Sequence, residues 1–413
     1  MAKTKRSAPE IEDKWFPIVL AILVAVAFSY SIRTTLQRYN YTFWIAEAML
    51  NGHVGWQIHP PSWLNEMVKT QGEYYSVFPL GAVLSVLPVV LVGNLGLLGR
   101  APENLLVSLL AGLCVYFFYL LAGLEPNSKP RRVILALFPI FGAWSWCNLG
   151  FGGAWQIALG FALLGQAAAL YFTFRRRWPL LAGAFFAMAF GNRTELILTL
   201  PIFLYFWSDP PAGHHLFERD AWTKSLRGSW KSLGLFLAIP IVLGLCTAAY
   251  NYARFGSIFD FGYTHIANLE KEPWYQHGLF SLYAIPWNLF KMLFEGMEDI
   301  AVFPYLRPHP FGCSIFLSSP FLFLLFREGG GNLKRLCWYT IGVLTLVLWC
   351  HGNPGGWQYS YRYAMILLPW MFLLIAQNGP RKLAATEVSL FLVSVALNAI
   401  AVYHFLWTTK MHP

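Results

Sequence analysis

The first candidate for acid–base chemistry is Glu47, which lies in the polar and aromatic segment from Asn40 to His53. Helical spacing puts Asn40, Glu47 and Asn51 on one face, at i, i+7 and i+11, and the other face is apolar. Gly52 is a natural stop for such a helix. We predict a short interfacial helix that shows one carboxylate to a polar cleft, with Glu47 as a general base and Asn40 as a substrate ligand. The alternative is that Glu47 is only the hydrated side of an amphipathic helix.

The second candidate base is Asp260, which stands between Phe259 and Phe261. Burial among aromatic rings raises the pKa of a carboxyl that has no charged partner, and a base with a raised pKa suits proton abstraction near neutral pH. A salt bridge, such as one to Arg254, is the alternative use of the same carboxylate.

Three arginines stand at the predicted membrane edge and could bind phosphate: Arg193, Arg254 and Arg362. A cation beside hydrocarbon is costly and is usually kept for a partner. A guanidinium binds phosphate oxygens through two parallel N–H groups, which makes a lipid phosphate a natural partner. Snorkelling to the interface, or an internal pair such as Arg193 with Glu195, remains the alternative.

Aromatic residues are dense in the two stretches that hold these candidates. In the first stretch, prolines, aromatic residues and amides between His59 and Pro79 indicate a folded loop and not a linker. Tyr74, Tyr75 and Tyr263 could stack on sugar rings, or they could sit at the level of the lipid headgroups. A further acidic set at i, i+3 and i+4, formed by Glu295, Glu298 and Asp299, could hold a divalent ion on one helix face, although such faces are more often hydrated. A divalent metal is therefore possible, but no residue is assigned to one.

The composition places this chemistry in a membrane. Of 413 residues, 57% are hydrophobic and only 12% are charged, about half the usual share, so the chain lacks the polar side chains to cover a hydrated surface. The net charge of +10 comes from short basic clusters between apolar runs, which favours membrane topology and anionic lipid over nucleic acid. The six cysteines are scattered without CxxC spacing, which argues against a disulfide framework or a zinc site.

Twelve apolar runs and five internal basic clusters set the topology. An even number of runs separates each cluster from the next, so all five can lie on the cytoplasmic side. A cytoplasmic N-terminus agrees with this only if one early run does not cross. We exclude residues 78–98, which carry Pro79, Pro88, Gly93 and Gly96 and suit a broken juxtamembrane helix. The prediction is an all-α, polytopic inner-membrane protein with about eleven transmembrane helices and its chemistry on the periplasmic or extracellular face.

The same reasoning divides the chain into four parts. Residues 1–14 form a cytoplasmic tail, and 15–251 form a seven-helix core that includes a long outer loop at 34–102. Residues 252–310 form a second outer loop, and 311–413 form the C-terminal transmembrane helices. No internal repeat marks two related halves.

Four motifs give the chain a family resemblance. They are YYSxFP at 74–79, PLLAGxxxxxAxxxR at 179–193, NYxRFGSxxxFGY at 251–263, and YRY at 361–363. In this order they resemble the bacterial GT-C superfamily of membrane glycosyltransferases, which includes the relatives of protein O-mannosyltransferases and aminoarabinose transferases. The resemblance extends from about residue 15 to residue 377. It implies a GT-C-like core with juxtamembrane helices in the first outer loop, a polyprenyl-phosphate sugar donor, and no nucleotide-sugar site.

The chain departs from that family at the position of its usual acid. Where family members carry an aspartate just after the first crossing, this chain has Asn40, and the second expected position at 148–153 has no acid. Glu47 is the carboxylate nearest to the expected place. The sequence therefore predicts sugar transfer to an unidentified glycan, polysaccharide or protein, with Glu47 or Asp260 as the base. A transporter or flippase of lipid-linked glycans, or a non-catalytic scaffold of this ancestry, is the alternative.

Overall fold

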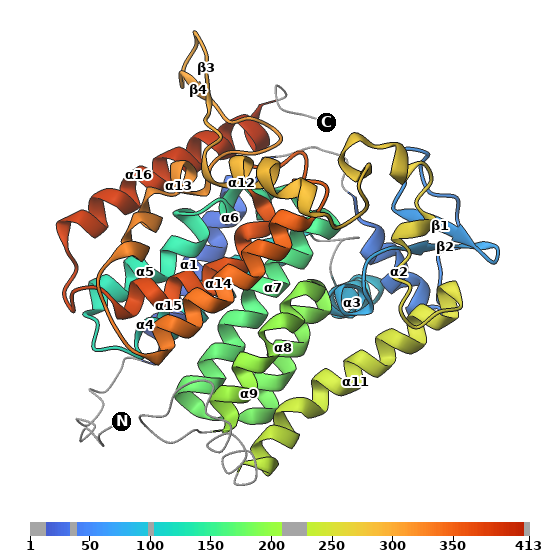
Figure 1. The fold of residues 1–413 in the computed structure, drawn as a ribbon, viewed down its shortest axis with the longest axis horizontal. Helices are drawn as coiled ribbons and strands as arrows, with labels where there is room; N and C mark the ends of the chain where they lie inside the picture. Colours follow the sequence, from blue (N-terminus) through green and yellow to red (C-terminus); the bar gives the residue numbers. More distant parts are fainter. Residues whose placement is uncertain (1–13, 34–38, 98–102, 209–228, 409–413) are drawn as a thin grey trace.

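The computed structural model describes residues 14–33, 39–97, 103–208 and 229–408. The first thirteen residues of the predicted cytoplasmic tail, and Arg219, Lys224 and Arg227 of one basic cluster, lie outside the described residues. The fold is helical, with two short β-hairpins (Figure 1). Its helices are α1 (Phe16–Ser31), α2 (Tyr41–Leu50), α3 (Leu80–Asn94), α4 (Glu103–Ala122), α5 (Lys129–Phe141), α6 (Ser145–Phe151), α7 (Gly153–Tyr171), α8 (Pro179–Asn192), α9 (Leu200–Ser208), α11 (Trp230–Phe255), α12 (Ile285–Leu293), α13 (Ile315–Ser318), α14 (Asn332–Cys350), α15 (Leu368–Gln377) and α16 (Ala385–Val402).

The helices are those of a polytopic membrane protein. Within the described ranges, five are long and apolar enough to cross a bilayer: α4, α7 with its extension to Arg176, α11, α14, and α16 with its extension to Trp407. The pair α5 and α6, bent by 46°, makes a sixth if it is one span. Five shorter apolar segments accompany them, and one contains α3, the helix excluded as a crossing. The figure of eleven crossings stays a prediction.

Close backbone contacts fix α8 between two neighbours. A Cβ on Gly183 of α8 would lie 1.9 Å from the carbonyl oxygen of Phe236 in α11. A Cβ on Gly81 of α3 would lie 2.5 Å from the backbone of Gly191 in α8. Since real Cβ atoms do not approach that closely, glycine at these places lets three helices meet. The C-terminal end of α8, where Arg193 follows, is thereby placed beside the start of α3.

The predicted helix after Asn40 is present and ends as expected. In α2, Gly52 has a φ of +83°, and its N–H donates to the carbonyl of Met49 at 3.1 Å. The N–H of His53 donates to the carbonyl of Ala48 at 2.9 Å. Together these two bonds form a Schellman motif, which satisfies carbonyls that a helix end leaves without partners.

The rest of the first long loop folds as a hairpin followed by α3. Strands β1 (Met67–Thr70) and β2 (Glu73–Ser76) pair antiparallel, with Thr70 opposite Glu73. Both turn residues, Gln71 and Gly72, have positive φ, which is the geometry that suits the twist of a two-residue hairpin. The prediction of a folded loop is confirmed here.

The acidic set near residue 295 is not on one helix face, contrary to the prediction. Helix α12 ends at Leu293, while Glu298 and Asp299 form strand β3, which pairs with β4 (Leu306–Arg307). This hairpin projects from the body of the protein above α12 (Figure 1). Glu295 pairs with Lys291, and Glu298 pairs with Arg307, so each of these two carboxylates has a cation of its own.

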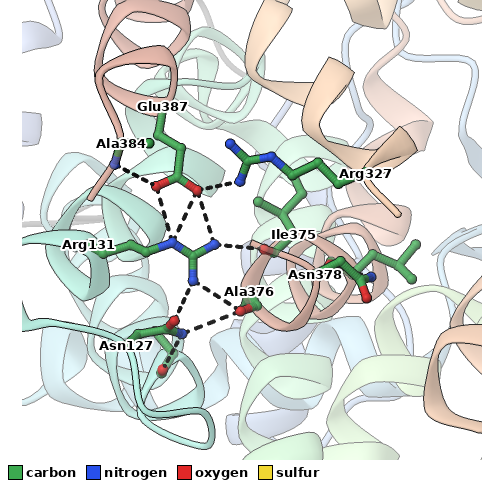
Figure 2. Close-up of polar contacts among 10 residues, drawn as sticks. Asn127, Arg131, Arg327, Ile375, Ala376, Asn378, Ala384 and Glu387 are labelled. Carbon is green, nitrogen blue, oxygen red and sulfur yellow. Dashed lines mark hydrogen bonds and ion pairs between the residues drawn. The ribbon is translucent and has the colours of Figure 1, made fainter. Parts of the chain in front are cut away.

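A buried ionic cluster joins three helices (Figure 2). Arg131 of α5 and Glu387 of α16 are 0% and 1% exposed, with 3.0 Å between Nη2 and Oε1. Arg131 also donates to Asn127 Oδ1 and to the carbonyls of Ile375 and Ala376 at the end of α15. Arg327 Nη1 donates to Glu387 at 2.6 Å. Every nitrogen of the Arg131 guanidinium therefore has a partner, and the cluster fixes α5, α15 and α16 together.

Candidate functional site

A cavity of about 760 Å³ lies where α3 begins and where α8 and α14 end. Its walls are largely apolar and aromatic, and several wall residues are exposed at the protein surface, including Ile197, Leu198, Phe259 and Phe280. The other lining residues include charged and polar side chains. The cavity is lined by Val77, Phe78, Pro79, Asn192, Arg193, Thr194, Glu195, Ile197, Leu198, Ser257, Phe259, Asp260, Phe261, Tyr263, Thr264, Leu279, Phe280, Val347, Leu348, His351 and Tyr363.

Segments distant in sequence bring the polar groups together. Arg193 ends α8 and precedes a 3₁₀ helix at Thr194–Thr199. Asp260 and Tyr263 come from the loop after α11, and His351 follows α14. Three of the residues predicted to take part in the chemistry, Arg193, Asp260 and Tyr263, therefore lie in the wall of one cavity.

Arg193 makes the internal ion pair that was the alternative to phosphate binding. Its Nε and Nη2 both donate to Oε1 of Glu195, at 2.9 Å and 2.6 Å. The two side chains are 16% and 15% exposed, so the pair faces the cavity instead of being enclosed by packing. The guanidinium also lies over the ring of Tyr363, 4.9 Å from its centre.

Asp260 pairs with His265, not with Arg254. Its Oδ1 accepts from the N–H of Gly262 at 2.7 Å, and its Oδ2 lies 2.8 Å from Nε2 of His265. The His265 ring stacks on Phe255, with 4.9 Å between ring centres and 15° between planes. The carboxylate is thus held in the cavity wall by one backbone and one imidazole contact.

Arg254 lies away from the cavity wall, fully buried at the end of α11. Its guanidinium donates to the carbonyls of Ser76 and Phe78 and, at 2.6 Å, to Oδ1 of Asn251. These contacts attach the end of α11 to the segment that begins α3. Arg254 is therefore placed to hold the loops together. Its predicted role as a phosphate ligand stays a prediction, because Arg254 is not among the residues that line the cavity.

Arg362 is also buried, at 6% exposed, and lies beside the cavity without lining it. Its Nη1 donates to the carbonyl of Gly356 at 3.0 Å, and its Nη2 donates to the hydroxyl of Tyr363 at 3.2 Å. The guanidinium lies 5.2 Å from the ring centre of Trp155. Through Tyr363, which does line the cavity, it supports the ring under Arg193.

Glu66 is a candidate that the sequence reasoning missed. Tyr41 donates its hydroxyl to one carboxylate oxygen, and Trp155 Nε1 lies 3.0 Å and 2.8 Å from the two oxygens. Burial raises the pKa of the Glu66 carboxyl to about 7, although these hydrogen bonds and the charge of Arg362 lower it. A carboxyl of that pKa can take a proton near neutral pH.

No local pattern marks Glu66. It stands between a loop rich in proline and aromatic residues and strand β1, and its partners lie 25 and 89 positions away. The one available signal was a carboxylate within a loop already expected to fold. Burial and the charge of Glu66 raise the pKa of Tyr263 in the cavity wall, and the charge of Arg193 lowers it.

The remaining predicted residues lie in the loop fold and not in the cavity wall. Glu47 is half-buried on α2, and Asn40 precedes the first turn of that helix with its Oδ1 buried and without a hydrogen-bond partner among the described residues. Tyr74 packs against His59, and Tyr75 donates its hydroxyl to Glu73 at 3.1 Å. The roles assigned to these four residues stay predictions.

The charge of the cavity wall is unbalanced. Among the described lining residues, Arg193 is the cation, and Glu195 and Asp260 are the carboxylates. Burial lowers the pKa of His351, whose Nδ1–H donates to the carbonyl of Asn353 at 2.7 Å, so its imidazole is neutral at pH 7. The described part of the chain holds no cluster of three or more His, Cys, Asp or Glu residues with the spacing of a metal site.

Comparison with known proteins gives one structural similarity. No protein-family model matches the chain, and no curated protein matches it in sequence. The fold is similar to the crystal structure of ArnT from Cupriavidus metallidurans bound to undecaprenyl phosphate, with 14% identity, a TM-score of 0.47 and 88% of this chain covered. The chain spans 60% of the length of that protein.

Proposed function

We propose that the protein transfers a sugar from a polyprenyl-phosphate donor to an acceptor at the membrane surface. The observation that carries the proposal is one cavity that combines exposed apolar walls with an arginine beside a carboxylate. A prenyl chain suits walls such as Ile197 and Phe280, which open to the surface. Arg193 then faces the phosphate, because its guanidinium already binds an anionic oxygen there through two N–H groups.

The reaction has one bond forming and one breaking at the anomeric carbon. The acceptor oxygen attacks this carbon while the bond from the carbon to the phosphate oxygen breaks, and that oxygen keeps the electron pair. The acceptor proton passes to a carboxylate, and the lipid leaves as a phosphate monoester. Arg193 stabilises the charge that develops on the leaving phosphate, and proton removal typically contributes a factor of about 10²–10⁴.

Three carboxylates are candidates for the base, and their surroundings rank them. Asp260 lies in the cavity wall and is oriented by Gly262 and His265. Glu66 has the pKa that suits the role, and its charge influences Tyr263 of the cavity wall. Glu47, predicted from the first loop, is not among the residues that line the cavity. We therefore place Asp260 and Glu66 ahead of Glu47.

The test is transfer by the purified full-length protein, supplied with a panel of polyprenyl-phosphate hexoses and pentoses and a membrane extract as acceptor. Release of polyprenyl phosphate is measured for Asp260→Asn, Glu66→Gln and Glu47→Gln. We expect a loss of about 10²-fold or more in one of the first two variants and little change in Glu47→Gln. Full rates in all three variants would show that none of these three carboxylates is the base.

The two alternatives give different results in the same system. Movement of a lipid-linked sugar across proteoliposomes, with no transfer product, would identify a flippase or transporter. Binding of polyprenyl phosphate that depends on Arg193, with no turnover of any donor in the panel, would identify a non-catalytic scaffold. Either result replaces the proposed transfer reaction.

A further inference from the structure

We propose that Glu195 distinguishes the two charge states of the lipid phosphate, and that it favours release of the monoester product over the phosphodiester donor. The inference rests on the proposed function, because it concerns the lipid that Arg193 binds. It assigns Glu195 the role of a specificity-determining residue that acts through the charge of its carboxylate.

Glu195 already occupies the position that a phosphate needs. Both N–H groups that Arg193 directs into the pair, on Nε and Nη2, converge on Oε1 of Glu195. Among the described residues, the guanidinium of Arg193 makes no hydrogen bond to any other group. A phosphate can therefore reach these donors only if it displaces the carboxylate or shares the guanidinium with it.

The charge of the ligand changes during the proposed reaction. A sugar linked to a lipid phosphate is a phosphodiester and carries one negative charge. Once the bond to the anomeric carbon breaks, the lipid carries a phosphate monoester with a charge of about −1.5 to −2 at pH 7. A carboxylate that shares the same cation repels the monoester more strongly, since the interaction scales with the product of the charges.

The rest of the cavity wall does not offset this repulsion. Asp260 adds a second negative charge, and His351 is neutral at pH 7 because burial lowers its pKa. Arg254 and Arg362 donate from their Nη1 and Nη2 atoms to backbone carbonyls and neighbouring side chains instead. Arg193 is thus the single cation of the described cavity wall, and Glu195 is the group that competes for it.

Glu195 is also the carboxylate of the wall with room to move. Asp260 is held through both oxygens, by Gly262 and by His265. Glu195 is held through Oε1 alone and lies in the first turn of a short 3₁₀ helix that borders the cavity. It can therefore leave Arg193 when the donor enters and return when the product leaves.

The experiment compares two ligands of matched shape and different charge. Binding of farnesyl phosphate and of methyl farnesyl phosphate, its phosphodiester, is measured with the full-length protein and with Glu195→Gln and Glu195→Ala. We expect both variants to bind the monoester about tenfold more tightly, and the diester no more than about threefold more tightly. Glu298→Gln is the matched control, since Glu298 forms the same type of pair with Arg307 on the projecting hairpin, and it should leave both affinities unchanged.

The outcomes separate this inference from the proposed function. Equal gains for both ligands, or no gain, would overturn the role of Glu195 while leaving the lipid-phosphate site in place. If neither ligand binds the unmodified protein, or if Arg193→Gln leaves both affinities intact, then the proposed lipid site itself is wrong, and this inference fails with it. A selective gain for the monoester in both variants supports the inference.

Discussion

Two arginine–glutamate pairs in this protein have the same chemistry and opposite surroundings. Arg131 and Glu387 lie between three helices at 0% and 1% exposure, and carbonyls and an amide satisfy the remaining guanidinium nitrogens (Figure 2). Arg193 and Glu195 lie in a cavity wall at 16% and 15% exposure, joined through one carboxylate oxygen. A fully satisfied pair holds helices together. A partly satisfied pair facing a cavity can exchange its partner for a ligand.

The physical reason is the cost of taking charges out of water. An ion pair enclosed by protein must be complete, because removing one partner leaves an uncompensated buried charge. A pair at a cavity remains near solvent or ligand, so losing one partner costs much less. The comparison therefore predicts that mutations at the two sites affect different properties: stability at the first, and ligand binding at the second.

The largest effect on stability is expected at the buried cluster. Glu387→Gln removes the single carboxylate that faces both Arg131 and Arg327. We expect the free energy of unfolding to fall by about 3–5 kcal/mol, which thermal unfolding in detergent would register as a large drop in Tm. Glu298→Gln on the exposed hairpin serves as the control and should cost at most about 1 kcal/mol. Equal melting of the two variants would mean that burial does not distinguish these pairs.

The next largest effect is a loss of activity with little change in the free energy of unfolding. Arg193→Gln is expected to lower the rate of sugar transfer by about 10²–10³-fold, because it removes the cation that stabilises the leaving phosphate. The free energy of unfolding should change by less than about 1 kcal/mol, because the Arg193–Glu195 pair is partly exposed. Both quantities are measured on the same preparation. A strongly destabilised Arg193→Gln protein that retained its specific activity would reverse the comparison and make this pair structural as well.

The smallest effect is a change in pH dependence at Glu66, a half-buried carboxyl that makes no ion pair with the described residues. If Glu66 accepts the proton, the rate of transfer rises with pH through about 7, since only the ionised form is a base. Glu66→Gln should abolish that rise.

Stability should change with pH in the opposite direction. Because the pKa of Glu66 is raised on folding, its neutral form is favoured in the folded protein. The contribution of Glu66 to the free energy of unfolding is therefore fully present below the ordinary pKa of a glutamate, and it is lost as the pH increases through about 7. Glu66→Gln should melt with less dependence on pH over this range. The same pH dependence in both proteins would show that another group titrates there.

Much of the local structure was predictable because it depends on short-range patterns. Apolar runs predicted the helices, and the residues from Asn40 to Gly52 predicted both α2 and its end at a glycine of positive φ. The proline and glycine residues at 78–98 indicated a broken, juxtamembrane or re-entrant helix, and α3 is a helix of 15 residues with Pro88 inside. The pairing of Arg193 with Glu195 was the stated alternative to phosphate binding, and it could be anticipated because the residues are two positions apart.

The candidate site was predicted only in part, because its contacts are between residues far apart in sequence. The prediction that Glu295, Glu298 and Asp299 share a helix face failed where α12 ends at Leu293. Spacing alone did not show that end. Arg254 and Arg362 were interpreted from their types, but each donates to backbone carbonyls as well as to a neighbouring side chain, and no pattern of side chains reveals those carbonyls.

The sequence by itself determined that this is a helical membrane protein with folded loops that carry carboxylates, aromatic rings and arginines. Composition and hydropathy decide that much, because the free energy of burying apolar surface depends on residue type and periodicity. Only the tertiary structure decided which charges meet. It enclosed Glu387 between two arginines, placed Glu66 against Tyr41 and Trp155, and left Arg193 with Glu195 in a cavity. The strength of a charge depends on its desolvation and on its neighbours, and packing sets both.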